Sequence, residues 1–371
     1  MTSQATYTSS GFSSLASADL NGDGLLDLVA GYVPPPTGYV PPTSNDFVVF
    51  LSQADGGLSP PVSYALSGSF GGAVAIGDLN GDGQPDVAVS YADFVGIFLN
   101  DGKGTLTEGA KLGARNGLVV GIAIGDINAD GFVDLIATEF SSGLGLTSAE
   151  VFYGQGHGIF AAAVALPGVG GTLLGNPVIG DLNLDGLPDI AAASSGDYAN
   201  LHLVVLLSQG DGGFQSTAYE TPLLGQLILL PRAAGAPDLA IANPNVPLGD
   251  GGFPESPGTI RLLVNSGDGR FSIGPSYPVP GGEFLTLGDF NGDCIPDIAT
   301  SACGATAFGS GLSVLYGDTD GGFEAPVSLQ TPAEICPAGL AVLGAVESPR
   351  ALASADLGAG GVTVYGNASR Q

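Results

Sequence analysis

The 371-residue sequence is poor in several residue types that carry enzyme chemistry. It contains no Trp, 1 Met, 2 His and 3 Cys. Neither His157 nor His202 has a second histidine at the spacing of a zinc site. There is no Gly-x-Ser-x-Gly elbow, and no glycine-rich phosphate loop precedes a helix. The sequence therefore lacks the usual signatures of serine hydrolases, zinc enzymes and nucleotide-binding enzymes, and the absence of Trp also weakens a lectin interpretation.

Long apolar runs and helical patterns are missing as well. No run reaches the length of a transmembrane helix, so we expect no membrane insertion. The start, Met1–Gln4, has neither the basic nor the apolar region of a secretion signal; a signal would then belong to a longer precursor.

Positive charge is scarce. The chain has 36 Asp plus Glu against 8 Lys plus Arg, a formal net charge of −28. Such a surface repels phosphate backbones and anionic lipids. Nucleic acid and membrane surfaces are therefore not expected as partners, although the acidity is also compatible with a role in solubility alone.

The abundant feature is a nine-residue motif, Asp-x-Asn-x-Asp-Gly-x-x-Asp. It begins at Asp19, Asp78, Asp126, Asp181 and Asp289, with Cys294 in place of Gly in the last copy. Oxygen-bearing side chains stand at positions 1, 3, 5 and 9, and a hard cation needs about six to eight oxygen ligands. An Asn/Asp/Gly-rich turn without metal is the alternative, and five copies argue against it. With the position-7 carbonyl included, the expected ligands are Asp19, Asn21, Asp23, Leu25, Asp27, Asp78, Asn80, Asp82, Gln84, Asp86, Asp126, Asn128, Asp130, Phe132, Asp134, Asp181, Asn183, Asp185, Leu187, Asp189, Asp289, Asn291, Asp293, Ile295 and Asp297.

The motif spacing indicates a repeat protein. The gaps are 59, 48, 55 and 108 residues, and the last equals two ordinary periods. A degenerate copy lies at residues 230–238 and a weaker one at residues 342–350. We expect no ion in either, because Arg232 and Arg350 replace ligands there. Long, regular periods predict a repeat architecture.

Each repeat predicts four short antiparallel strands. In the second, apolar residues precede and follow the loop 78–86, and a turn at Asn100–Gly104 connects two further strands. Four strands repeated around an axis describe a propeller blade. We expect an all-β, seven-bladed β-propeller occupying residues 1–371 as one domain. The N-terminal segment should complete the last blade, which would remove exposed sheet edges.

The run Gly72–Gly83 resembles the FG-GAP (VCBS) repeat of integrin α-subunit heads and many bacterial secreted proteins. The resemblance implies a seven-bladed propeller with calcium between the first and second strands of its blades, here five ions. Weak calcium loops need millimolar metal, so an extracellular or periplasmic location is expected. The family includes adhesion modules, lectins and propellers attached to enzymes, and fold alone does not choose among them.

Two long loops on the face opposite the metal loops, residues 31–46 and 243–258, are the candidate ligand-binding segments. Tyr32 and Tyr39 lie in the first, which prolines stiffen, and Tyr on a rigid frame makes good contacts. A merely solvated loop is the alternative. The sequence favours a monomeric, non-catalytic propeller that binds a protein or glycan; an extracellular polysaccharide lyase or hydrolase remains the second hypothesis.

The three cysteines are expected to form one disulfide. Cys294 lies in a metal loop, whereas Cys303 and Cys336 are expected on the opposite face where neighbouring blades join. Bridging requires Cα atoms within about 7 Å. The prediction is a Cys303–Cys336 disulfide with Cys294 unpaired, and the alternative is three reduced thiols.

Overall fold

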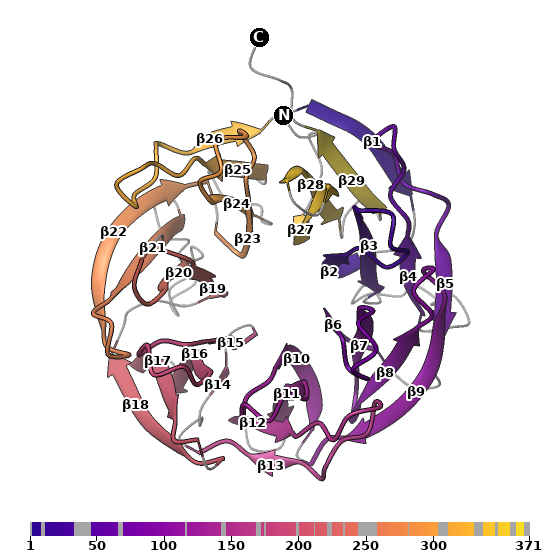
Figure 1. Ribbon diagram of the computed structural model, residues 1–371. Helices are drawn as coiled ribbons and strands as arrows, with labels where there is room; N and C mark the ends of the chain where they lie inside the picture. Colours follow the sequence, from indigo (N-terminus) through magenta and orange to yellow (C-terminus); the bar gives the residue numbers. More distant parts are fainter. Residues whose placement is uncertain are drawn as a thin grey trace. The chain divides into compact units, whose positions relative to one another are not determined.

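The structure is a computed structural model, and it describes most of the chain. The described residues are 2–8, 12–32, 46–65, 70–115, 117–141, 146–167, 172–173, 176–197, 200–210, 212–220, 225–232, 234–243, 258–280, 282–302, 311–329, 337–345, 348–356 and 361–366. They form 29 strands and no helix (Figure 1). Within them, no helix is long and apolar enough to cross a membrane.

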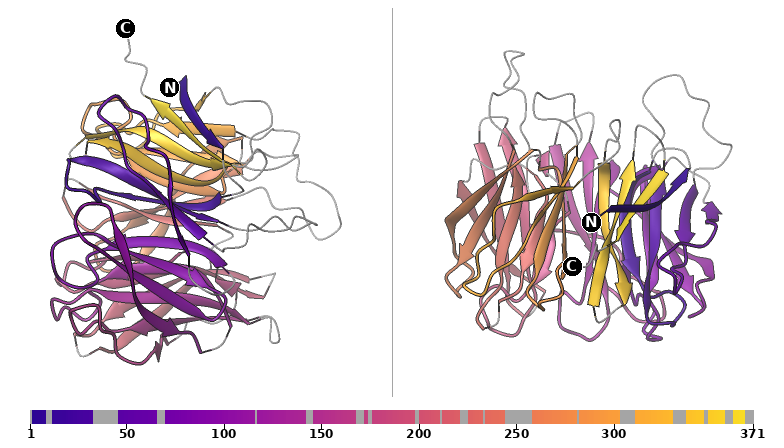
Figure 2. Two further views of the ribbon diagram at one scale, coloured as in Figure 1. Left: turned by 90° about the vertical axis from the view of Figure 1, so that its right-hand side faces the viewer. Right: turned by 90° about the horizontal axis from the view of Figure 1, so that it is seen from above.

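The chain divides into two compact units. Unit 1 comprises Met1–Ala65, Ala242–Arg261 and Pro275–Gln371, and unit 2 comprises Leu66–Ile241 and Leu262–Gly274. Each contains complete antiparallel sheets, whose twisted strands are seen from two further sides in Figure 2.

Four sheets follow the predicted four-strand pattern in chain order. They comprise β6 (Phe70–Gly77), β7 (Asp86–Tyr91), β8 (Phe94–Asn100) and β9 (Leu106–Gly113); β10 (Leu118–Gly125), β11 (Asp134–Ser141), β12 (Leu146–Phe152) and β13 (Val164–Ala165); β19 (Leu227–Leu230), β20 (Asp238–Asn243), β21 (Gly258–Asn265) and β22 (Phe271–Val279); and β23 (Phe284–Gly288), β24 (Asp297–Ala302), β25 (Gly311–Leu315) and β26 (Val327–Leu329).

A fifth sheet differs only at its first strand. Two short strands, β14 (Thr172–Leu173) and β15 (Val178–Gly180), both pair with β16 (Asp189–Asp197), and β17 (Asn200–Ser208) and β18 (Phe214–Glu220) complete the sheet. These sheets confirm an all-β propeller of four-stranded antiparallel blades.

The predicted number of seven blades is wrong for this structure, which has five separate blades. The strands expected for the first and last blades instead form one eight-stranded sheet. It contains β1 (Thr2–Thr8), β2 (Phe12–Ala18), β3 (Leu25–Tyr32), β4 (Asp46–Phe50), β5 (Val62–Ala65), β27 (Pro337–Ala345), β28 (Ser348–Asp356) and β29 (Gly361–Gly366). The strand β1 pairs with β29, so the two ends of the chain meet in this sheet; closure of a complete ring stays a prediction.

The joining of the two blades follows from the degenerate seventh repeat. The segment 342–350 is not a nine-residue loop, because β27 pairs with β28 up to Ala345 and Ser348. Strand β27 therefore continues beyond the point where a metal loop would begin. Its last two residues, Gly344 and Ala345, pair with Leu26 and Leu25 of β3.

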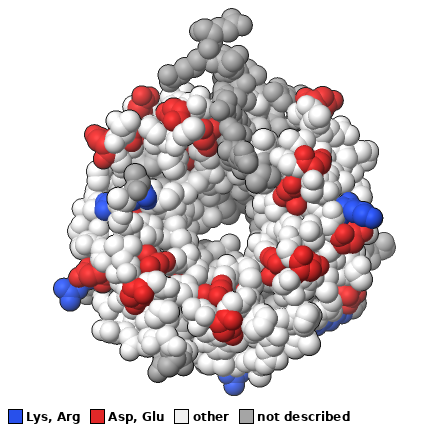
Figure 3. Space-filling view, in the orientation of Figure 1, with Lys and Arg blue, Asp and Glu red and all other residues white. Residues whose placement is uncertain are grey.

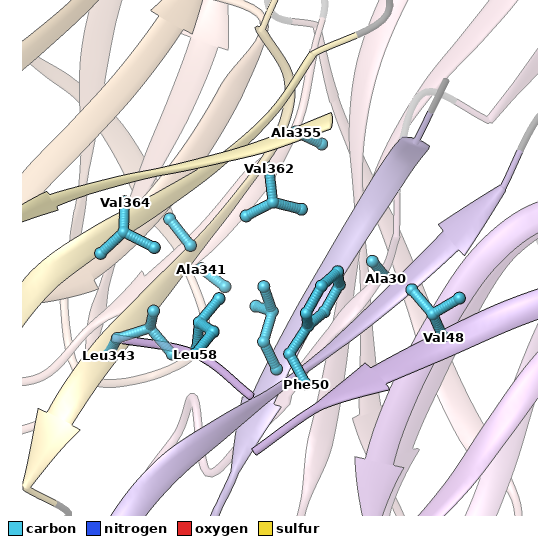
Figure 4. Close-up of a cluster of buried hydrophobic side chains, with 11 residues drawn as sticks. Ala30, Val48, Phe50, Leu58, Ala341, Leu343, Ala355, Val362 and Val364 are labelled. Atoms are coloured by element: carbon cyan, nitrogen blue, oxygen red, sulfur yellow. The ribbon is translucent and has the colours of Figure 1, made fainter. Parts of the chain in front are cut away.

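Apolar side chains at alternating positions along the strands form the core. In unit 1, Leu28 and Ala30 of β3 pack with Val48 and Phe50 of β4 on one face of the sheet (Figure 4). Strands β27, β28 and β29 contribute apolar side chains to the same cluster, which includes Val364. Removing each large side chain from water stabilises the fold by about 1.5–3 kcal/mol. The core thus holds strands from both ends of the chain together.

Candidate metal centre

Each intact loop is organised around its first aspartate. In the loop between β6 and β7, Asp78 Oδ1 accepts the N–H groups of Gly81 at 2.8 Å and Asp82 at 3.1 Å. Its Oδ2 accepts the N–H of Gly83 at 2.8 Å. The carboxylate therefore lies inside the loop and draws the backbone around itself.

The third and fifth side chains turn into the same loop. Asp82 N–H donates to Asn80 Oδ1 at 2.8 Å, and Asn80 Nδ2 donates to Asp82 Oδ2 at 3.0 Å. Gln84 N–H donates to Asp82 Oδ1 at 2.8 Å. The amide-to-carboxylate contact recurs at 2.8–3.1 Å in the other four intact loops, between Asn21 and Asp23, Asn128 and Asp130, Asn183 and Asp185, and Asn291 and Asp293.

The backbone of the loops is left-handed at positions 4 and 6. Glycines fill both positions in the second loop, but Ala129 and Leu184 occupy position 4 elsewhere with φ of 57° and 63°, and Cys294 occupies position 6 with φ of 66°. A left-handed conformation costs a residue with a Cβ about 1–2 kcal/mol. The loop geometry is retained against this cost, so the hydrogen bonds, and not glycine alone, determine it.

The ninth residue has a different environment. Asp86 is fully buried; its Oδ2 accepts the N–H of Leu79 at 3.0 Å, and its Oδ1 accepts the N–H of Asn100 at 2.8 Å. It therefore joins the start of its loop to the end of the third strand, an arrangement named here the carboxylate clip. The same two bonds, at 2.7–2.9 Å, are made by Asp27 with Leu20 and Ser52, by Asp134 with Ile127 and Gly154, by Asp189 with Leu182 and Ser208, and by Asp297 with Phe290 and Gly317.

Burial changes the acidity of the clip residues. It raises the pKa of Asp27, Asp86 and Asp297 to about 6, against the opposing effect of the two N–H donors. The pKa values of Asp134 and Asp189 are raised for the same reason. A neighbouring cation would favour the ionised form of these carboxyls.

The donor set of each loop fits a hard cation. Two carboxylates, one amide oxygen and the position-7 carbonyl are the oxygen ligands that calcium accepts. Among the described residues, no three His, Cys, Asp or Glu side chains gather in a metal-binding group; the Asp at position 9 accepts two backbone N–H groups instead. The ligand role of position 9 stays a prediction.

The degenerate fifth loop uses an arginine inside its clip. Asp238 Oδ1 accepts the N–H of Asn265 at 2.6 Å, as in the intact loops. Its Oδ2 accepts Arg232 Nε at 2.6 Å in place of a backbone amide. Arg232 Nη1 also donates to the Asn265 carbonyl at 3.4 Å. The predicted replacement of ligands by arginine thus has a structural counterpart within this loop.

Two contacts that the sequence did not indicate join a loop to the hairpin of the following repeat. His157 N–H donates to the Asn80 carbonyl at 2.9 Å, and Gly269 N–H donates to the Leu182 carbonyl at 3.0 Å. His157 has a φ of 56°. The glycines on either side of it indicate a hairpin turn in the sequence, but they do not indicate its contact with the neighbouring loop. The loops are therefore supported from the neighbouring blade within unit 2.

Acidic side chains dominate the surface around these loops. Figure 3 shows several separate groups of Asp and Glu on the face that it displays, and few basic side chains. Within the part of the chain that the structure describes, Asp23, Asp82, Asp130, Asp185 and Asp293 are exposed at position 5. These exposed carboxylates are accessible to a cation from solvent.

The other predicted site residues are less informative. Tyr32 ends β3, but the placement of its side chain lies outside the description, as does Tyr39. Cys303 and Cys336 also lie outside the described residues, so their disulfide stays a prediction. Cys294 is a free, exposed cysteine.

Comparisons with known proteins agree with the motif and the blades. The family model described as FG-GAP-like repeat matches residues 19–89 and 78–137. A search of curated proteins found no match. Among solved structures, BBS1N in complex with ARL6DN is similar, with a TM-score of 0.57 and 11% identity over 98% of this chain and 97% of that one.

The exotype rhamnogalacturonan lyase YesX is also similar, with a TM-score of 0.51 and 11% identity over 100% of this chain and 75% of that one. At such low identity these likenesses concern the fold alone. Residues 19–137 thus match the FG-GAP-like repeat, and the described strands form the four-stranded antiparallel blades of a β-propeller.

Proposed function

We propose that the protein is a non-catalytic binding module whose propeller blades are stabilised by five calcium ions, one in each intact loop. The main supporting observation is that two hydrogen bonds recur in all five loops: the position-6 N–H donates to Oδ2 of the first Asp, and the position-3 Asn amide donates to the position-5 carboxylate. Positions 4 and 6 are left-handed in every loop, including three residues that are not glycine. Such uniformity supports a structural metal role for all five, since a catalytic site would distinguish one repeat from the others.

Calcium binding is tested by counting the bound ions and by measuring the thermal unfolding of the protein. Metal that binds only the folded chain stabilises it by mass action. We expect five ions per chain by elemental analysis and a lower melting temperature in excess EDTA. Fewer than three ions per chain together with unchanged melting in EDTA would contradict the proposal.

The ligand is proposed to be a protein or glycan that contacts the segment 31–46. A fold relative solved in complex with a protein partner supports the protein class. An extracellular or periplasmic location is proposed with it, because weak calcium loops fill only at millimolar metal. A glycan array and pull-down with the calcium-loaded protein would identify the ligand. Replacing Tyr32 and Tyr39 by Ala should then weaken binding, and unchanged affinity would argue against this segment.

An enzyme acting on polysaccharide is the second candidate. The observation that favours it is the fold likeness to a rhamnogalacturonan lyase. Incubation of the calcium-loaded protein with pectic polysaccharides separates the two functions, since a lyase releases unsaturated products that absorb ultraviolet light, whereas a binding module leaves the polymer intact.

A further inference from the structure

A pair of buried carboxyl groups lies in unit 2, away from the metal loops. Glu139 on β11 and Glu150 on β12 are both fully buried. The register pairs Glu150 with Ala137 and Glu139 with Ser148. Residues two apart on a strand share a face, so the two glutamates are diagonal neighbours on one face of the sheet.

The two carboxyls differ in their partners. Glu139 Oε1 accepts the backbone N–H of Arg115 at 2.9 Å, and Ser148 Oγ lies 3.4 Å from Glu139 Oε2. Neither oxygen of Glu150 has a hydrogen-bond partner among the described residues. The guanidinium of Arg115 is the nearest cation, with Nε 3.7 Å from Glu150 Oε1, and it is half exposed.

A single proton held between the two carboxyl groups makes this arrangement favourable. Two facing carboxylates can hydrogen-bond to each other only when one of them is protonated. With one proton the pair carries a single negative charge, which Arg115 balances; without it, two negative charges face one half-exposed cation. Burial first, and then Glu139, raise the pKa of Glu150 to about 7, whereas Arg115 opposes that rise.

The other neighbours of Glu150 carry no charge. Its cross-strand partner on β13 is Ala165. Ala137, on the same face, packs in an apolar cluster with Val95 and Leu112 of the preceding blade. Glu139 and Arg115 are thus the charged groups that act on Glu150 within the described part of the chain.

We propose that Glu139 and Glu150 share one proton and, with Arg115, form a pH-sensitive latch on the third repeat. Arg115 lies in the connection between β9 and β10, and its Nη1 lies 3.4 Å from the carbonyl oxygen of Ala163, just before β13. The latch therefore links β11, β12 and the segment before β13 to the incoming chain. Loss of the shared proton places an unbalanced charge beneath Arg115 and loosens this blade.

The first test is the titration of the unmodified protein. In chain labelled with ¹³C at the glutamate carboxyls, we expect one carboxyl resonance to titrate near neutral pH and to be absent from Glu150→Gln. If every glutamate carboxyl titrated in the usual range for exposed glutamates, the proposal would be overturned.

The second test measures opening of the blade by amide hydrogen exchange in β11 and β12. The equilibrium for opening should rise by up to about tenfold per pH unit between the usual glutamate pKa and neutrality. Glu150→Gln, which keeps a donor facing Glu139, should abolish this dependence. The control Glu108→Gln removes an exposed glutamate paired with Lys111 at 3.1 Å and should keep it. Equal pH dependence in wild type and Glu150→Gln would refute the latch.

Discussion

Arg232 donates to Asp238 Oδ2 through Nε at 2.6 Å, where an intact loop offers the backbone N–H of its second residue. The carboxylate clip of the fifth repeat is therefore complete although its first, third and fifth ligands are lost. The guanidinium completes the clip, and at the same time it adds positive charge to a loop that has lost the acids of positions 1 and 5. This relationship explains how the fifth repeat keeps the same strand connection although its loop has lost three residues of the motif.

Arg232→Ala should destabilise the protein by about 1–3 kcal/mol, because Asp238 would remain largely buried with one oxygen unpaired. Denaturant unfolding should show the same loss with and without EDTA. Arg270→Ala is the matched control: Arg270 is exposed and lies 3.7 Å from Asp268, so its loss should stay within about 0.5 kcal/mol. Equal effects of the two changes would contradict the clip assignment.

Asp86→Asn should destabilise the metal-free protein. Two N–H donors face Asp86, and the amide group of Asn offers one acceptor oxygen, so one donor loses its partner at a cost of about 1–3 kcal/mol. Unfolding in excess EDTA measures this clip role separately from any metal role. Asp82→Asn, an exposed change in the same loop, should be nearly neutral in EDTA and should instead weaken calcium binding. If the metal-free Asp86→Asn variant were as stable as the wild type, the stabilising role assigned to the carboxylate clip would be contradicted.

The stabilisation by calcium should grow as pH rises from about 4 to 7. Burial raises the pKa of Asp27, Asp86 and Asp297 to about 6 in the metal-free protein. A raised folded-state pKa contributes stability below the unfolded value that is lost as pH rises through 6. Bound calcium favours the ionised carboxyls and releases these protons. Calorimetry with calcium and with EDTA should show a widening gap in melting temperature; a gap that narrows over this range would contradict the prediction.

Gly83→Ala should cost about 1–2 kcal/mol through backbone strain alone. Gly83 has a φ of 84°, and a Cβ built there meets nothing within 4 Å. Gly113→Ala, also in open space but without a positive φ, should change stability by less than about 0.5 kcal/mol. Both substitutions add one methyl group in open space, so chemical unfolding of the two variants isolates the cost of the backbone strain at position 83. Similar stabilities of the two variants would show that the loop relieves this strain by changing its backbone conformation.

Cys303 and Cys336 should be found in one linked peptide when the protein is mapped without reduction, with Cys294 alkylated in the folded state because it is exposed. An oxidising compartment would favour that pairing. A link to Cys294, or two unpaired thiols at 303 and 336, would contradict this prediction.

The sequence by itself determined the features that depend on local chemistry. The spacing of Asp78, Asn80 and Asp82 indicated a loop that collects oxygen atoms, and alternation in the flanking segments indicated strands. The four-stranded blades and the FG-GAP-like repeat are confirmed. They could be predicted from the sequence because turns, and pairing between strands that are neighbours in sequence, need few long-range contacts.

The tertiary structure alone decided what depends on distant partners. The spacing of the motif predicts Asp86 as a metal ligand. Its hydrogen bond to the backbone N–H of Asn100 depends on where the third strand of the blade lies, which the sequence does not specify. The blade count changed because β27 continues past its missing loop and pairs with β3, which lies more than 300 residues earlier in the chain. Glu139 and Glu150 carried no motif at all, since their chemistry arises from burial and from a diagonal register that sequence periodicity does not specify.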